Sequence, residues 1–349
     1  MVLKRALNYI NNKGARAAVK RGLSKAVPKL LIEFPALNAL PSELMIEPTS
    51  VCNLRCPLCS NKSLKRKHGR MSLEKFKTVL DKAGPQVKKV VIGLTGEPLL
   101  NKEVWKMIKE ARSRGIFVEM PSNFVLLDNF EMKEVIDADL NRLIVSLDGA
   151  SEKTYKKYRV GGDFKRVVKN VKALCKAKEN AGTKNPEVVI QFLVMKHNKH
   201  EIKAIEKLAR GMHADVLSLK NTMLWTSLTK SKREELAEKW LPEEEQYRIL
   251  DKELKEVRGS PKVCPAVFDY CSVLWNGDLC LCCNDFEGEY LVGNIIKQDF
   301  AEIFRSKKYN ALRKAALEKT LPLCRECEIS NGTFGGKSIR LKGDSDEKN

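Results

Sequence analysis

Three cysteines stand close together in one short stretch of this chain. They are Cys52, Cys56 and Cys59, in the run Cys-Asn-Leu-Arg-Cys-Pro-Leu-Cys. Thiolates are soft ligands that suit iron–sulfur clusters and zinc, and a cubane cluster has four iron corners. Three thiolates would leave one iron without a protein ligand, so that a small molecule could bind there. A structural zinc site and thiols buried for packing are the alternatives, but zinc sites favour paired Cys-x2-Cys knuckles.

The residues before this run predict where the cysteines lie in the fold. The stretch 44–47, Leu-Met-Ile-Glu, is mostly apolar and predicts a strand, and the Pro-Thr-Ser stretch at 48–50 predicts a loop after it. We therefore expect the three cysteines to follow the carboxyl end of a strand.

The spacing Cys-x3-Cys-x2-Cys after a first strand resembles the signature of the radical S-adenosylmethionine (radical SAM) enzymes. The resemblance implies a 4Fe-4S cluster whose open iron is chelated by the amino and carboxylate groups of S-adenosylmethionine (SAM). It also implies reductive cleavage of SAM to a 5′-deoxyadenosyl radical that takes a hydrogen atom from a substrate, with an electron donor such as a ferredoxin or flavodoxin. The residue before the third cysteine is often aromatic in that family and is Leu58 here, which weakens one expected contact to the adenine.

The same resemblance assigns the contacts to SAM. The segment 94–98, Leu-Thr-Gly-Glu-Pro, matches the family's Gly-Glu-Pro segment. A glycine allows close backbone approach and a carboxylate pairs with a cation, so Gly96 and Glu97 are expected to meet the ammonium group. The remaining matched positions are expected to reach the ribose and the carboxylate: Ser122, Asn123, Ser146, Asp148 and Arg159, the last with a guanidinium fork suited to a carboxylate.

Helix capping is the alternative role for Ser122, Asn123 and Asp148, and it does not exclude binding. The histidines form no metal-binding pattern, and the sequence identifies no catalytic acid or base.

Strand and helix patterns alternate between residues 41 and 224. The predicted strands are 44–48, 88–94, 116–121, 142–147, 187–195 and 215–221. Such alternation predicts a parallel sheet, and six strands are too few for a closed eight-stranded barrel. We therefore predict an α/β fold, a partial (β/α)6 TIM-like barrel open on one side, which the family resemblance also implies. A small C-terminal Cys-rich iron–sulfur domain is expected to follow it.

That second domain is expected from another group of cysteines. Cys264 and Cys282 flank Gly277, and Asn276-Gly277 between apolar runs predicts a hairpin that turns Cys282 back toward Cys264. Cys324 and Cys327 add a Cys-x2-Cys pair.

The arrangement resembles the SPASM or twitch domains that follow many radical SAM cores. The resemblance implies an auxiliary 4Fe-4S cluster on Cys264, Cys282, Cys324 and Cys327. The full SPASM form continues with further cysteines, and this chain has none after Cys327, so we expect one auxiliary cluster and not two. A structural zinc at the same thiolates is the alternative, and the choice among Cys280, Cys282 and Cys283 stays open.

Composition suggests the domain boundaries of the chain and the kinds of partner that it could bind. We expect basic amphipathic helices at 1–40, the radical SAM core at 41–224, a helical connector at 225–258, the auxiliary-cluster domain at 259–335 and a flexible tail at 336–349. The net charge of +20 is compatible with nucleic acid, an anionic membrane or an acidic substrate, and equally with a lysine-rich solvated surface. No apolar run approaches the roughly 20 residues of a membrane span. We predict a cytoplasmic protein, with peripheral membrane contact through 1–40 as an option.

The sequence thus predicts a radical SAM enzyme with an unidentified substrate. Related enzymes act on peptides, on sugars or amino-sugars, and on lipids. Two other classes stay open, a two-cluster electron-transfer protein and a zinc-stabilised nucleic-acid-binding protein. The basic charge favours the second, but the β–α core argues against nucleic acid as a partner.

Overall fold

The computed structural model describes residues 31–34, 39–224, 230–244, 266–325, 327 and 336–342. Within these residues, ten strands form one sheet in the order β10-β6-β5-β4-β3-β2-β1-β7-β8-β9. Its six consecutive parallel strands are β1 (Glu43–Ile46), β2 (Lys89–Ile92), β3 (Phe117–Ser122), β4 (Arg142–Ser146), β5 (Glu187–Val194) and β6 (Val216–Asn221). These are the six predicted strands, each bound lying within two residues of its prediction. The α/β partial barrel is therefore confirmed.

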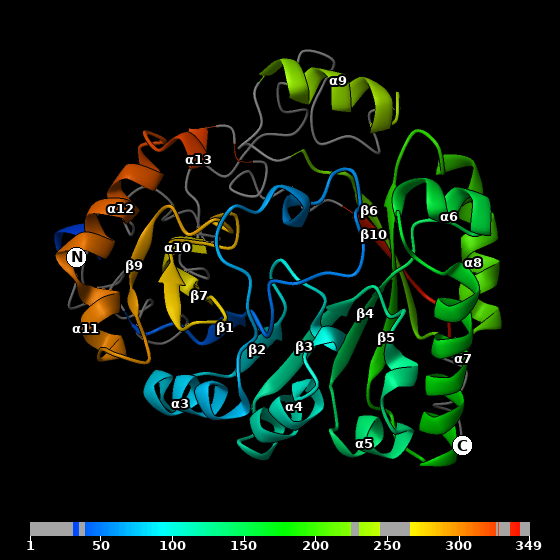
Figure 1. Ribbon diagram of the computed structural model, residues 1–349, viewed down its shortest axis with the longest axis horizontal. Coiled ribbons are helices and arrows are strands. Elements are labelled where there is room, and N and C mark those ends of the chain that lie inside the picture. The colour runs from blue at the N-terminus through cyan, green and yellow to red at the C-terminus, as the bar shows by residue number, and fades with distance from the viewer. Residues whose placement is uncertain are drawn as a thin grey trace, which may run out of the picture.

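Helices cover the outer side of the curved sheet (Figure 1). They are α3 (Leu73–Ala83), α4 (Val104–Ser113), α5 (Met132–Asp137), α6 (Glu152–Tyr158), α7 (Phe164–Asn180) and α8 (Ile202–Gly211). Helix α3 shows why they form there: the Ser72 hydroxyl accepts a hydrogen bond from the Lys75 N–H at its start, and Gly84, with φ 87°, ends it. Its buried Phe76, Val79 and Leu80 face the sheet, and each such side chain stabilises the fold by roughly 1.5–3 kcal/mol.

The C-terminal cysteine-rich region extends the core sheet instead of standing apart from it. Strand β7 (Tyr270–Val273) pairs in parallel with β1, and β8 (Asp278–Cys280) and β9 (Leu291–Asn294) follow antiparallel. The predicted hairpin at Asn276-Gly277 is confirmed, with Gly277 at φ 89°. The helices of this region are α10 (Ala266–Asp269), α11 (Phe300–Arg305), α12 (Lys307–Leu317) and α13 (Pro322–Arg325).

The prediction of a flexible tail from residue 336 is wrong for its first residues. They form β10 (Gly336–Arg340), which pairs antiparallel with β6. Beyond the strand, Lys342 Nζ lies 2.8 Å from Asp215 Oδ1, and the Leu341 N–H donates to the Asp215 carbonyl. A pairing partner far away in the chain therefore orders a segment that is polar in sequence. Residues 343–349 lie outside the described part.

Helix α9 (Lys230–Trp240) lies within the predicted connector and crosses the open end of the barrel (Figure 1). Residues 225–229 and 245–265 lie outside the described residues, and so do 1–30 and 35–38, where the basic helices were expected. Of that segment, Leu31 is buried against the core. Within the described ranges, no helix combines the length and the apolar character needed to cross a bilayer.

Candidate cofactor site

The three cysteines lie on the loop between β1 and α3, which crosses the inner side of the curved sheet (Figure 1). Cys56 is buried, and Cys52 and Cys59 are half-buried. Burial raises the pKa of Cys52 to about 12, against the hydrogen bond from the Leu54 N–H, and the charges of Glu97, Cys59 and Cys56 raise it further. The three thiols stand on the same short loop. Binding to iron would replace their protons.

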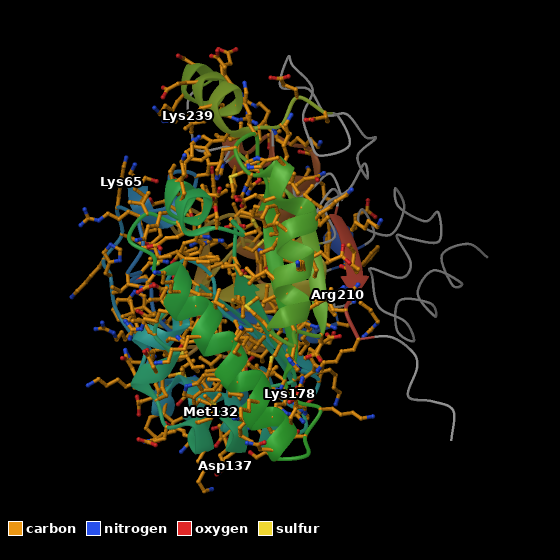
Figure 2. The ribbon with its side chains drawn as sticks, turned by 90° about the vertical axis from the view of Figure 1, so that its right-hand side faces the viewer. Lys65, Met132, Asp137, Lys178, Arg210 and Lys239 are labelled. Atoms are coloured by element: carbon orange, nitrogen blue, oxygen red, sulfur yellow. The ribbon has the colours of Figure 1, made fainter. Side chains whose placement is uncertain are left out.

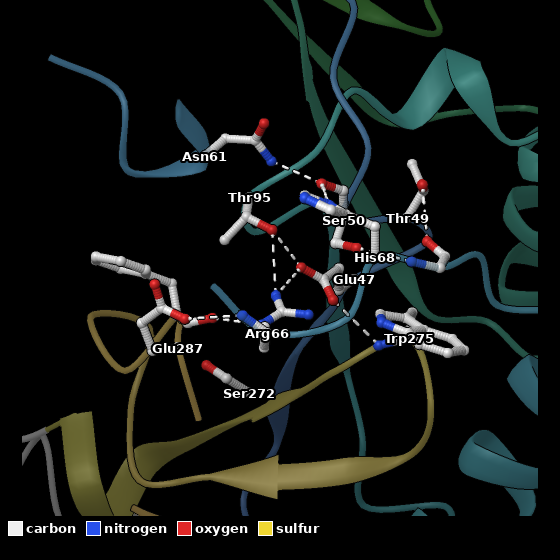
Figure 3. A network of polar contacts seen from close by, with 12 residues as sticks. Glu47, Thr49, Ser50, Asn61, Arg66, His68, Thr95, Ser272, Trp275 and Glu287 are labelled. Atoms are coloured by element: carbon white, nitrogen blue, oxygen red, sulfur yellow. Dashed lines mark hydrogen bonds and ion pairs between the residues drawn. The ribbon is translucent and has the colours of Figure 1, made fainter. Parts of the chain in front are cut away.

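An ion pair joins the two ends of this loop (Figure 3). The Glu47 carboxylate, just after β1, is fully buried, and Arg66 Nη2 lies 2.5 Å from its Oε1. The Thr95 hydroxyl donates to the same oxygen, and the Trp275 N–H donates to Oε2 at 3.2 Å. Three donors therefore satisfy a buried charge that would otherwise be costly. An acid at the end of an apolar strand was the signal for it in the sequence, and the motif analysis did not single it out.

The C-terminal region holds the same loop from outside (Figure 3). The Glu287 carboxylate accepts hydrogen bonds from the N–H groups of Lys65 and Arg66 at 3.1 and 3.2 Å. Arg66 Nε donates to the Phe286 carbonyl at 2.6 Å, and Trp275 Nε1 donates to the Lys67 carbonyl at 3.2 Å. Residues 275–287 therefore fix the segment that follows the third cysteine.

Glu97 lies at the centre of a second polar group, beside Cys52. Its carboxylate is 2% exposed and accepts hydrogen bonds from the Ser122 hydroxyl at 2.6 Å, the Asn123 N–H at 2.7 Å and the Leu99 N–H at 3.1 Å. Burial raises the pKa of Glu97, and these hydrogen bonds oppose that rise. The structure thus brings together three of the residues expected to contact SAM: Glu97, Ser122 and Asn123.

Gly96 is required by the packing of the chain on itself. A Cβ at this position would lie 2.1 Å from the Thr49 carbonyl oxygen and 2.7 Å from that of Val51. The Glu97 N–H donates to that same Val51 carbonyl at 2.8 Å. The backbone that approaches Gly96 is the start of the loop that carries Cys52, Cys56 and Cys59. The expected contact of Gly96 with SAM stays a prediction.

Arg159 is held by Asp148 and faces one thiol of the cysteine triad, which consists of Cys52, Cys56 and Cys59. Its Nε lies 2.5 Å from the fully buried Asp148 Oδ2, and its Nη1 lies 3.8 Å from Cys56 Sγ. Asp148 Oδ1 accepts from the Leu193 N–H at 2.7 Å. Burial opposes the charge of Arg159, but Asp148 and Cys56 raise its pKa well above its usual value. A permanent cation therefore stands beside a predicted cluster ligand, while Ser146 is half-buried at the end of β4.

A pocket of about 340 Å³ opens between the cysteine loop and α9. Its lining includes Leu58, Cys59 and Trp240 together with Lys62 and Lys239. The Trp240 ring contacts the rings of Tyr158 and His197 edge-on, with centroids 5.5 and 5.3 Å apart. Helix α9 thus supplies an aromatic wall near the third cysteine, where the sequence has Leu58 in place of the aromatic residue frequent in the family.

The predicted auxiliary ligands are buried where the structure describes them. Cys282, Cys324 and Cys327 are each less than 10% exposed, and Asn284 Nδ2 donates to Cys327 Sγ at 3.6 Å. The segment that holds Cys282 therefore lies against the Cys-x2-Cys pair. Cys264 lies outside the described residues.

The neighbouring cysteines have other contacts. Cys280 is fully buried in β8, where its Sγ contacts the Ser272 carbonyl at 3.5 Å, and Cys283 Sγ lies 2.7 Å from the Tyr270 hydroxyl. Burial raises the pKa of Asp285 to about 6, and its carboxylate accepts hydrogen bonds from the N–H groups of Glu289 and Tyr290.

The donor set around the first loop fits a cluster with one open corner. Three soft thiols stand on one loop, Cys56 is buried and Cys52 and Cys59 are half-buried, and the Arg159 guanidinium lies 3.8 Å from Cys56 Sγ. Across the described ranges, no three His, Cys, Asp or Glu side chains converge tightly enough to ligate a single ion. In a cubane cluster each thiolate binds a different iron, so the three thiols need not converge on a single ion to hold it.

Comparison with known families agrees with both cysteine groups. The model of the Radical SAM superfamily matches residues 46–209, and the model of SPASM, described as an iron-sulfur cluster-binding domain, matches residues 264–328. The first match covers the cysteine loop and most of the parallel strands. The second begins at Cys264 and ends just after Cys327.

Individual relatives match between about half and four fifths of the chain. The "Tungsten-containing aldehyde ferredoxin oxidoreductase cofactor-modifying protein" of Pyrococcus furiosus is 23% identical over 82% of this chain and 87% of its own length. The "Probable GTP 3',8-cyclase" of Methanocaldococcus jannaschii is 32% identical over 49% of this chain and 56% of its own length.

Solved structures share the fold. Streptococcus suis SuiB bound to S-adenosylmethionine is 16% identical, with a TM-score of 0.61 over 93% of this chain and 84% of SuiB. The structure titled "Native anSMEcpe with bound AdoMet" is 20% identical, with a TM-score of 0.57 over 84% of this chain and 92% of that chain. At this identity the likeness establishes the fold. The two domain models show that the chain belongs to the radical SAM superfamily of enzymes and carries a C-terminal SPASM iron–sulfur cluster-binding domain.

Proposed function

We propose that this enzyme cleaves SAM reductively and abstracts a hydrogen atom from a small-molecule or peptide substrate, with one auxiliary 4Fe-4S cluster. The observation that carries the proposal is the loop of Cys52, Cys56 and Cys59, which offers three thiols and whose ends are fixed by a buried ion pair. When bound there, the cluster supplies one electron for cleavage of the SAM sulfonium, which yields methionine and a 5′-deoxyadenosyl radical.

The residues of the chain position the reactants. The three thiolates hold the cluster, and Glu97 with Ser122 and Asn123 provides the polar surface expected to receive the ammonium group of SAM. Because Asp148 already pairs with Arg159, the guanidinium reaches a SAM carboxylate only through a nitrogen that Asp148 leaves available. The Trp240 ring of α9 forms an apolar wall of the pocket that Cys59 borders.

The names of the relatives support the substrate class. They include a cofactor-modifying protein, a probable GTP cyclase and a mycofactocin maturase, and one SuiB structure is described as bound to a precursor peptide. Small metabolites and peptides are therefore the classes to be tested first.

A single auxiliary cluster is supported by the number and the contacts of the remaining cysteines. No cysteine follows Cys327. A second auxiliary cluster would have to draw on Cys271, Cys280 and Cys283, of which Cys271 contacts the buried Tyr309 hydroxyl and Cys280 lies inside β8. We expect about eight irons per chain, whereas two auxiliary clusters would give about twelve.

The test uses protein purified without oxygen and reconstituted with iron and sulfide. With dithionite and SAM, the wild-type enzyme is expected to form 5′-deoxyadenosine and methionine. The double variant Cys324→Ala/Cys327→Ala should retain about four irons and still cleave SAM, but it should no longer complete turnover of the substrate. Absence of 5′-deoxyadenosine in the wild type would refute the proposal, because a protein that only transfers electrons leaves SAM intact.

A further inference from the structure

The segment immediately after the third cysteine is strongly basic. Residues 61–70 read Asn-Lys-Ser-Leu-Lys-Arg-Lys-His-Gly-Arg and contain no acid. Arg66 turns inward to Glu47, whereas Lys62, Lys65 and Lys67 are exposed. The Glu47–Arg66 ion pair and the hydrogen bonds from the Lys65 and Arg66 N–H groups to the Glu287 carboxylate hold the backbone of this segment. The three lysine side chains extend from it into solvent.

These lysines lie beside a cluster ligand. The Lys62 N–H donates to the Cys59 carbonyl at 3.3 Å, and Lys62, Lys232 and Lys239 line the same pocket as Cys59. Figure 2 places Lys65 and Lys239 toward the same end of the molecule. Glu235 lines the pocket as well and pairs with Lys232 at 2.7 Å, so the basic character beside Cys59 comes from Lys62 and Lys239, with Lys65 and Lys67 on the adjoining segment.

Protein covers the Cys56 side of the three cysteines. Tyr158 is buried there, and Arg159 Nη1 lies 3.8 Å from Cys56 Sγ. Trp275 and Phe286 contact the base of the loop. Cys59 is half-buried and borders a pocket, which offers a path for an electron that enters from a protein docked at the surface.

We propose that Lys62, Lys65, Lys67 and Lys239 form the docking surface for an acidic one-electron carrier of the ferredoxin or flavodoxin type. The inference rests on the proposed function, because the cluster must be reduced before each cleavage of SAM. One electron passes from the reduced carrier, which is oxidised by one electron, to the oxidised cluster, and no bond or proton changes at that step. Opposite charges steer such transient encounters and speed association by roughly 10- to 1,000-fold.

The position of the charges favours this partner over nucleic acid. They gather at the site where electrons must enter, next to Cys59, and the carrier must come close to that site to reduce it. Electron-transfer complexes are small and short-lived, so a compact group of exposed lysines suffices to form one.

The test compares two reductants in the formation of 5′-deoxyadenosine by the full-length reconstituted enzyme. One is an acidic flavodoxin reduced by its NADPH-dependent reductase, and the other is dithionite, which needs no docking surface. The variant is Lys65→Glu/Lys67→Glu, which leaves the lining of the pocket beside Cys59 unchanged. Its control, Lys169→Glu/Lys172→Glu, reverses as many charges on the exposed face of α7.

Reversal of the loop charges is expected to slow the flavodoxin-driven reaction at low salt by about tenfold or more and to remove its dependence on ionic strength. The dithionite-driven rate should stay within about twofold of the wild type, which also shows that the variant is folded, and the control should behave as the wild type does with both reductants.

An unchanged flavodoxin-driven rate would refute the proposal that these lysines bind an electron carrier. It would do so even if the variant had lost affinity for RNA, because the surface would then bind nucleic acid. An equal loss with dithionite would also overturn it, because the lysines would then act on the site itself. If dithionite drives no cleavage even in the wild type, the proposed function fails first, and this inference fails with it.

Discussion

Arg66 Nη2 lies 2.5 Å from Glu47 Oε1 and so joins the two ends of the loop that holds Cys52, Cys56 and Cys59. The loop conformation is thereby fixed by protein contacts that need no cluster. Because the same arginine donates to the Phe286 carbonyl, one side chain connects the first cysteine group to the region of the second.

Glu47→Gln should destabilise the fold, because it leaves the Arg66 charge inside the protein without its partner. We expect the free energy of unfolding to fall by about 3 kcal/mol and the iron content after reconstitution to fall with it. Chemical denaturation and iron analysis measure both. The control is Glu43→Gln on the same strand, whose partly exposed pair with Lys89 at 3.3 Å should contribute less than about 1 kcal/mol. Equal effects of the two variants would contradict the role given to Glu47.

Glu287→Ala should lower the protection of the backbone amides in residues 60–70, which follow the third cysteine. The variant removes the acceptor of the Lys65 and Arg66 N–H groups. Since a hydrogen bond to a charged group contributes about 1.5 kcal/mol, amide exchange at residues 60–70 should become roughly tenfold faster. Hydrogen exchange followed by mass spectrometry measures this. The nearby exposed Glu289→Ala serves as control, and unaltered exchange in the Glu287 variant would show that these hydrogen bonds are not needed.

Arg159→Gln should lower the reduction potential of the cluster on the triad. A cation and N–H donor 3.8 Å from Cys56 Sγ stabilises the more negative, reduced state. An EPR-monitored redox titration without SAM should rank the potentials as wild type, then Arg159→Lys, then Arg159→Gln. The control Arg166→Gln removes an exposed arginine that pairs with Asp128. A role confined to the SAM carboxylate would weaken SAM binding and leave these potentials equal.

His197 should make the docking of α9 sensitive to acid. Burial, with Lys157 nearby, lowers its pKa to about 4, and its ring contacts that of Trp240. The unfolded chain takes up this proton near pH 6.5. The stability that the neutral ring contributes is therefore complete above about pH 6.5 and is lost as the pH falls toward about 4.

Thermal unfolding between pH 4 and pH 7 tests this prediction. His197→Phe keeps a ring in the same place without a titrating group, so its midpoint should change less over this range than that of the wild type. Parallel curves for the two proteins would refute the assignment.

Local signals in the sequence predicted the strands and the cysteine groups. Parallel strands buried on both faces appear as short apolar runs, such as the one that became β5, and glycines such as Gly84 and Gly277 mark the turns. The hairpin at Asn276-Gly277 followed from turn chemistry that depends on adjacent residues alone.

Contacts between distant residues could not be predicted in this way. Glu287 and Lys65 are separated by 222 positions, and no periodicity links them. Strand β10 escaped prediction because its polar residues gain order only by pairing with β6. The family resemblance led us to expect both Asp148 and Arg159 near SAM, but it did not indicate that the two side chains pair with each other.

The central claim is that three protein thiolates leave one iron open for SAM, and electron–nuclear double resonance tests it most directly. The enzyme is reduced in the presence of SAM that carries isotope labels at its amino nitrogen and its carboxylate oxygen. We predict hyperfine coupling of both labels to one cluster, retained in Cys324→Ala/Cys327→Ala and lost in Cys52→Ala/Cys56→Ala/Cys59→Ala. A reduced cluster on the N-terminal loop that shows no coupling to either label, or that has four protein ligands, would contradict the account.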